Sequence, residues 1–333
     1  MHLRSRQMRL QDTRACAELV ASIPSLRRRY GSDMGLLANA FRKVLRSESL
    51  RNCILEDLDA PNPFLGFANL VFVTDEFVRE CKTAPLFWIA PELARRIMQG
   101  NSPILTPRQV KEANSTNGLN ALTWQEAMRP LSESDRMVVH CESLQRFDRE
   151  VRGYNLKELM GQAPNALDAR VKANMGGLRW HPEEGRYLPL TLEEAETIAD
   201  RPHVLGITRE LVLNNPGNFL STVLLYVPPR IYFAPSEQRI LCAALDGATD
   251  DELSHELKVS LGMIKKTWRQ IYSRVAARCP DILPDSQNNG SEAAARGREK
   301  KQRLLAYLRD HPSELRPASR KLLEKKFTAK NSD

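Results

Sequence analysis

Apolar and polar residues follow two periodicities over the first half of the chain, one typical of helices and one typical of strands. Helical spacing predicts helices over 12–22, with Asp12 as the cap, and over 36–45. Two apolar runs, 52–58 and 64–73, are joined by Asp-Ala-Pro-Asn-Pro, which predicts a hairpin because Pro and Asn favour turn dihedrals. The same criteria assign strands over 86–89, 119–124 and 136–141, and helices over 142–153 and 155–161. We therefore expect a mixed α/β domain over residues 1–189.

A second pattern runs from residue 233 to residue 277, where the helical periodicity is interrupted by two sharp turns. Pro235 and Ser236 open the first helix, and Gly247 ends it, because Gly adopts the left-handed conformation common at helix ends. Thr249 and Glu252 have the spacing of a capping box. Ser260 can cap a third helix. The stretch 233–283 is therefore predicted to be an all-α domain of three helices.

The third helix has two faces of opposite character. One face is an apolar stripe at helical spacing, made by Ile264, Trp268, Ile271 and Val275. The other carries Lys265, Lys266 and Arg269, and no acidic residue occurs between Lys258 and Pro280. A helix of this kind fits the major groove of DNA, where basic side chains neutralise phosphates. A solvated basic face on a three-helix scaffold is the alternative.

Charge follows the same division. Residues 230–333 hold 20 Lys/Arg and 14 Asp/Glu, a net charge of +6, whereas the preceding residues hold 29 and 27, a net charge of +2. This bias favours an anionic partner, and we predict double-stranded DNA. A basic tail that only promotes solubility would not be patterned on one helix face.

The remaining segments connect and extend these two parts. Residues 190–232 are predicted to be a helical connector, with helices over 191–199 and 205–213 and an apolar run over 219–227. Residues 284–296 are rich in Ser, Asn, Gly and Ala, which predicts a flexible linker. Residues 297–333 form a basic helical segment in which Leu304, Leu305 and Leu308 share one side.

Several classes of protein are not indicated. No apolar run could span a membrane, and the first residues lack the apolar core of an export signal, so a cytoplasmic protein is expected. Six cysteines are scattered without a Cys-x-x-Cys pair, so neither disulfides nor a metal site is predicted. No GxSxG, phosphate-binding loop or HExxH is present, and no catalytic residue is assigned. His140 and Cys141 are expected to be structural because neighbours in a strand point to opposite faces.

The three-helix stretch resembles the helix-turn-helix domain of LuxR/GerE-type transcriptional regulators. The resemblance runs through Pro235, Glu237, Ile240, Leu241, Gly247, Glu252, Leu253, Leu257, Val259, Ser260, Gly262, Ile264, Lys265, Arg269, Ile271 and Val275. It implies that the third helix contacts DNA through Lys265, Lys266 and Arg269, with Ser260 and Gly262 at its N-terminus. It also implies a homodimer, for which Leu304, Leu305 and Leu308 are candidate contacts. Ala234 stands where this family has a capping Thr, so Ser236 is expected to supply that cap.

The N-terminal half is similar in element order to GNAT-type acyltransferases, over roughly residues 6–180. That family holds the acetyl-CoA pyrophosphate in a Q/R-x-x-G-x-G/A loop at a helix N-terminus. The nearest phrase here, Arg152-Gly153-Tyr154-Asn155, has one Gly and a bulky Tyr. We therefore expect no bound cofactor, little acetyl-CoA affinity and no turnover, and an unrelated α/β domain is the alternative.

The sequence thus predicts a sequence-specific DNA-binding transcription regulator whose N-terminal domain senses a small-molecule effector or mediates interactions. A GNAT-type acyltransferase with a nucleic-acid-targeting helix-turn-helix tail is the alternative. An adaptor whose helix-turn-helix no longer binds DNA is a third hypothesis, which the basic face disfavours.

Overall fold

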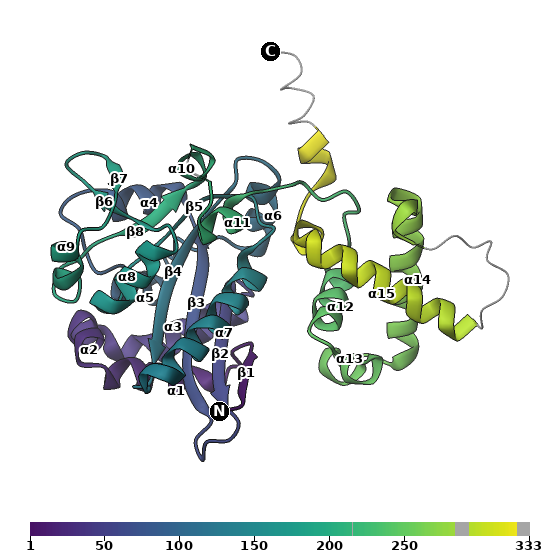
Figure 1. The fold of residues 1–333 in the computed structure, drawn as a ribbon, viewed down its shortest axis with the longest axis horizontal. Coiled ribbons are helices and arrows are strands. Elements are labelled where there is room, and N and C mark those ends of the chain that lie inside the picture. Colours follow the sequence, from purple (N-terminus) through teal and green to yellow (C-terminus); the bar gives the residue numbers. More distant parts are fainter. Residues whose placement is uncertain (215, 284–292, 325–333) are drawn as a thin grey trace, which may run out of the picture. The chain divides into compact units, whose positions relative to one another are not determined.

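The computed structural model describes residues 1–214, 216–283 and 293–324 (Figure 1). The chain separates into two compact units. The first unit comprises Met1–Ala113, Asn117–Arg152 and Leu156–Leu225. The second comprises Tyr226 onwards, together with the short segments Asn114–Thr116 and Gly153–Asn155.

The first unit is a mixed α/β structure built on one eight-stranded sheet, with the strand order β1-β2-β3-β4-β5-β8-β6-β7. Its strands are β1 (Leu3–Arg6), β2 (Leu50–Asp57), β3 (Phe64–Val73), β4 (Leu119–Met128), β5 (Leu156–Gly161), β6 (Leu178–His181), β7 (Arg186–Leu188) and β8 (Leu205–Thr208). The helices of this part of the chain are α1 (Asp12–Ser22), α2 (Pro24–Tyr30), η1 (Gly31–Leu36), α3 (Leu37–Arg46), α4 (Asp75–Lys82), α5 (Ile89–Gln99), α6 (Pro107–Ser115), α7 (Glu133–Val151), α8 (Ala166–Asn174), α9 (Leu192–Thr197), α10 (Arg209–Asn214) and α11 (Phe219–Leu224).

The sheet is antiparallel except where β4 meets β5. The predicted hairpin is confirmed as β2 and β3, which pair in antiparallel register. β4 and β5 pair in parallel, and α7 makes the crossover that a parallel connection requires. Their pairing ends at Thr123 and Gly161, where a Cβ on Gly161 would lie 2.9 Å from the Thr123 Cβ. β4 continues to Met128 without β5 beside it.

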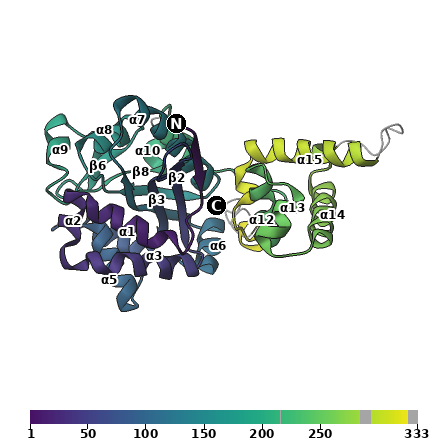
Figure 2. The same ribbon diagram turned by 90° about the horizontal axis from the view of Figure 1, so that it is seen from below.

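Helices cover both faces of the sheet (Figure 2). α1, α2, α3 and α5 lie on one face, and α7 and α8 lie on the other. The main core is on the first face, where Phe41 makes edge-to-face contacts with Phe67 and Trp124 at centroid distances of 5.6 Å and 4.8 Å. These aromatic rings bury large apolar areas, so the first face supplies most of the hydrophobic stabilisation of this unit.

Some local predictions for the first unit are wrong. The segment 136–141 is not a strand but part of the helix α7, whose start is fixed by the Ser132 cap, with Asp135 N–H donating to Ser132 Oγ at 3.2 Å. The helix predicted over 142–153 is confirmed as far as Val151, in the same α7. Residues 155–161 form strand β5 instead of a helix, because β4 and β8 hydrogen-bond it on both sides. The predicted strand 86–89 is absent, and 205–213 begins as strand β8 rather than as a helix. Asp12 lies in the first turn of α1, and the N-cap is Gln11.

The second unit is helical over its described elements, which are α12 (Pro235–Leu245), α13 (Asp250–Leu257), α14 (Leu261–Arg278), η2 (Pro280–Ile282), α15 (Ala293–Asp310) and η3 (Pro312–Leu315). The capping box of Thr249 and Glu252 is confirmed, with Thr249 N–H donating to Glu252 Oε2 at 2.7 Å. Gly247 has the expected positive φ of 93°. Ser236 does not cap α12. The N-cap is Ala234, whose N–H donates to Glu237 Oε2 at 2.7 Å.

The apolar stripe of α14 is confirmed, because Ile264, Trp268, Ile271 and Val275 are all buried. The Trp268 indole N–H donates to Asp250 Oδ1 at 3.2 Å, and its ring stacks on Tyr272. The Lys301 ammonium of α15 lies 4.8 Å from the Trp268 ring centroid and 3.1 Å from Asp250 Oδ1. Trp268 therefore joins α13, α14 and α15.

Two of the dimer contacts predicted on α15, Leu304 and Leu308, are wrong. Leu304 and Leu308 are buried in the core of their own unit, at 0% and 1% exposure, and Leu305 packs against the same core. Side chains that are fully covered within one chain cannot also bind a second copy. This part of α15 instead covers the core that α12, α13 and α14 form. Of the predicted linker and tail, residues 284–292 and 325–333 lie outside the described residues.

We expect Trp268→Ala to lower the free energy of unfolding of the second unit by about 3–5 kcal/mol, because it removes a buried ring and leaves a cavity. Hydrogen exchange of the α12 and α14 amides in the full chain would measure this. Lys266→Ala, on an exposed neighbour in the same helix, is the control and should change the free energy by less than about 0.5 kcal/mol. Equal protection in the two variants would contradict the assignment.

Candidate ligand cavity and candidate nucleic-acid interface

The five residues predicted to contact DNA all lie at the surface of the second unit. Lys265, Lys266 and Arg269 are exposed on α14 and make no hydrogen bond or ion pair with any described residue. Ser260 is the N-cap of α14, and its Oγ accepts the Met263 N–H at 3.2 Å. Gly262 is exposed in the first turn. The N-terminal half of α14 therefore presents positive charge and no competing carboxylate.

Two other basic residues of this stretch have structural roles. Lys258 adopts the left-handed conformation, with φ of 53°, at the turn between α13 and α14. Arg274 is half-buried and pairs with Glu237 at 2.9 Å, so it is bound to α12. Lys265, Lys266 and Arg269 therefore lie together on one exposed face of α14, as the helical spacing predicts, and Lys258 and Arg278 are exposed near its two ends.

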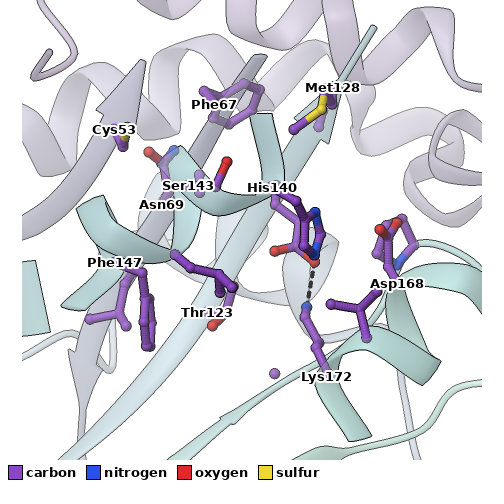
Figure 3. A pocket seen from close by; sticks show the side chains of 18 of the residues that line it. Cys53, Phe67, Asn69, Thr123, Met128, His140, Ser143, Phe147, Asp168 and Lys172 are labelled. Atoms are coloured by element: carbon purple, nitrogen blue, oxygen red, sulfur yellow. Dashed lines mark hydrogen bonds and ion pairs between the residues drawn. The ribbon is translucent and has the colours of Figure 1, made fainter. Parts of the chain in front are cut away.

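A cavity of about 680 Å³ lies in the first unit, between the sheet and helices α7 and α8 (Figure 3). Its size is within the range of small-molecule sites. Most of its lining is apolar and includes Cys53, Leu70, Met128, Leu144, Phe147, Leu167, Val171, Met175, Leu205 and Leu220. The cavity includes the part of β4 that runs past the end of its pairing with β5.

Four ionisable side chains gather on one side of this cavity, and we call them the charged cluster: Glu126, His140, Asp168 and Lys172. Lys172 donates to the Glu126 carboxylate, and Asn165 Nδ2 donates to Asp168 Oδ2 at 2.7 Å. The pKa of Asp168 is raised above its usual value, first by burial and then by the negative charge of Glu126, although Lys172, Asn165 and His140 oppose the shift. His140 makes no hydrogen bond with any described residue.

The structure offers no obvious pyrophosphate site at the places that the sequence suggests. The phrase Arg152-Gly153-Tyr154-Asn155 is followed by strand β5 and not by a helix N-terminus. Asn155 is buried, and its N–H donates to Asn114 Oδ1 at 2.7 Å. The N-terminus of α7 carries Glu133 and Asp135, which already occupy the positive end of the helix dipole and would repel a phosphate.

The charged cluster is not predictable from the sequence pattern. That pattern places His140 in a strand with a structural role, whereas the residue lies on α7 and lines the cavity. The cluster comes from β4, α7 and α8, and no spacing in the sequence connects these elements. The only local signal is a His between apolar residues of an amphipathic helix.

The chain that leads from β5 to α8, beside the charged cluster, is held by buried polar contacts. Gln162 Nε2 donates to Phe87 O at 3.0 Å and to His203 O at 2.6 Å. His203 Nε2 accepts the Ala163 N–H at 2.9 Å, which requires an unprotonated nitrogen there. Burial lowers the pKa of His203 to about 3. Protonation of His203 would therefore break a contact that positions this segment.

No protein-family model matches this chain, and no curated protein matches it in sequence. One similar solved structure is that of FeeM, an N-acyl amino acid synthase from uncultured soil microbes. The alignment has 12% identity, covers 67% of this chain and 96% of that chain, and has a TM-score of 0.36. A likeness at this level carries no argument about what the chain does.

Within the described residues, no helix combines the length and apolar composition needed to cross a membrane. In the same part of the chain, no group of three or more His, Cys, Asp or Glu residues is placed to hold a metal ion.

We expect His203 to make folding sensitive to acid. The pKa of His203 is lower in the folded state than its ordinary 6.5, so the unfolded state binds more protons as the pH falls. Its contribution is complete above about pH 6.5 and is lost towards pH 3, by at most about 1.4 kcal/mol per pH unit. Denaturant unfolding at pH 7, 5.5 and 4.5 would measure this. His203→Gln should flatten the profile, and an unchanged slope in that variant would count against the assignment.

Proposed function

We propose that this protein is a sequence-specific DNA-binding transcription regulator of the LuxR type, with a first unit that binds a small-molecule effector. The observation that carries the proposal is the arrangement of α14, whose apolar stripe is buried while Lys265, Lys266 and Arg269 are exposed and unpaired among the described residues. A helix of this kind fits the major groove, and its capped N-terminus can meet a phosphate. The cavity in the first unit supports the effector part of the proposal.

We expect the triple variant Lys265→Ala, Lys266→Ala, Arg269→Ala to bind DNA more weakly and with less salt dependence. Each lost phosphate contact lowers the slope of log affinity against log salt by about 0.9, so the triple variant should lose roughly 3. Binding to sites identified by genome-wide mapping would be titrated at several salt concentrations.

The control is a charge-matched variant of the first unit, Arg46→Ala, Arg108→Ala, Arg186→Ala, at three exposed positions. It lowers the net charge equally but leaves α14 intact. Equal slopes for both variants would refute contact through α14, because the effect would then follow net charge alone.

A second candidate is a GNAT-type acyltransferase that carries a nucleic-acid-targeting tail. The observation that favours it is a cavity lined by Glu126 on β4 and His140 on α7, because a carboxylate and an imidazole can each act as a general base. In such a reaction, the amine nitrogen attacks the carbonyl carbon of an acyl thioester, the thiol leaves, and one of these groups takes the proton from the nitrogen.

For this candidate we expect the full chain to release thiol from acyl thioesters, offered with chains from acetyl to decanoyl in a mixture of amines. The double variant Glu126→Gln, His140→Gln should be slower by about 100-fold or more if these groups act as the base. Thermal melts would control for folding. No thiol release at any chain length would exclude the transferase and leave the regulator.

A further inference from the structure

The cavity has a polar side and an apolar side, and α7 sets the distance between them. His140 belongs to the charged cluster, and Phe147 lies two turns further along α7, about 10 Å away at the helical rise. Figure 3 shows His140, Asp168 and Lys172 on one side of the cavity and Cys53 and Phe147 on the other. A matching ligand has one polar head and an apolar body of at least that length.

The groups of the charged cluster select the kind of head. Lys172 already donates hydrogen bonds to the Glu126 carboxylate and to Gln162 O, the second at 3.4 Å. Two groups of the cluster can still bind a ligand. The Asp168 carboxylate accepts one hydrogen bond, from Asn165, and has further acceptor sites, and the His140 ring makes no hydrogen bond with a described residue. An ionised carboxylate has about four acceptor sites, and a neutral imidazole has one. A head that donates hydrogen bonds therefore fits the Asp168 carboxylate, and the His140 ring nitrogen that carries no proton can accept a second one.

The charges of the charged cluster also favour a head that donates hydrogen bonds. The charged cluster contains two carboxylates and one lysine, so an ammonium group would balance it and a carboxylate would be repelled. Other charged side chains also line the cavity, among them Arg136, one turn before His140 on α7, and each of the arginines has a partner of its own. Arg51, Arg129 and Arg136 donate to backbone carbonyls, Arg146 pairs with Glu150, and Glu133 is exposed at the start of α7.

We propose that this cavity binds a primary amine with an apolar chain, its ammonium group held by Asp168 and His140 and its chain directed along α7 towards Phe147. The inference rests on the proposal that the first unit binds a small molecule, and it names the class of that molecule. Under the regulator, the amine is the effector, and under the transferase, it is the acceptor.

The test is calorimetric titration of the full chain at neutral pH with three probes of equal chain length: decylamine, decanoate and decanol. We expect one decylamine per chain, bound at least tenfold more tightly than decanoate. Asp168→Asn, which keeps the shape but removes the charge, should weaken decylamine at least tenfold. Glu183→Gln, at an exposed carboxylate outside the cavity, should have no effect.

The variant Ala68→Phe tests whether the probes bind inside the cavity. Ala68 is exposed on β3, lines the cavity and pairs with Cys53 and Glu126, so a Phe there would occupy the cavity. This variant should abolish binding of all three probes, with thermal melts as the check on folding. Binding that persists in Ala68→Phe would overturn the inference.

The probes also separate this inference from the broader proposal. Decanoate or decanol binding as tightly as decylamine, or Asp168→Asn without effect, would refute the amine while leaving a small-molecule site. If none of the three probes binds, the ligand class and the small-molecule role of the cavity both fail.

Discussion

The first unit depends on the point at which β4 and β5 stop pairing. Their parallel hydrogen bonds end at Thr123 and Gly161, and β4 continues to Met128 paired only with β3. Here the end of β4 is bordered by the segment that leads into α8, so Glu126 on β4 meets Lys172 on α8. The part of β4 beyond the end of β5 lines the cavity and supplies Glu126 to its charged side.

The second unit depends on the strict division of α14 into two faces. Trp268 and the other buried residues of its stripe hold the helix to α13 and α15, while Lys265, Lys266 and Arg269 make no hydrogen bond or ion pair with the described residues. Stability and charge are therefore supplied by different positions of one helix. A surface that is not used to hold the fold together keeps its capacity for a partner.

The sequence predicted those features that are determined by interactions between residues close together in the chain. The β2–β3 hairpin, the Thr249 capping box and the α14 stripe were predictable because turn chemistry, caps and spacing determine them. Strand β5 was not, because its backbone is satisfied by two strands distant in sequence. The charged cluster could not be predicted for the same reason. His140 and Asp168 become neighbours only after α7 and α8 have packed on the sheet.

The burial of Leu304 and Leu308 has a consequence for synthesis of the chain. The core of the three-helix region is completed by side chains that follow it by more than one helix length in the sequence. A ribosome therefore releases α12, α13 and α14 before α15 exists to cover them, and the nascent region has an open apolar surface during that interval. A chain truncated before α15 would keep that surface permanently, which favours capture by chaperones and aggregation.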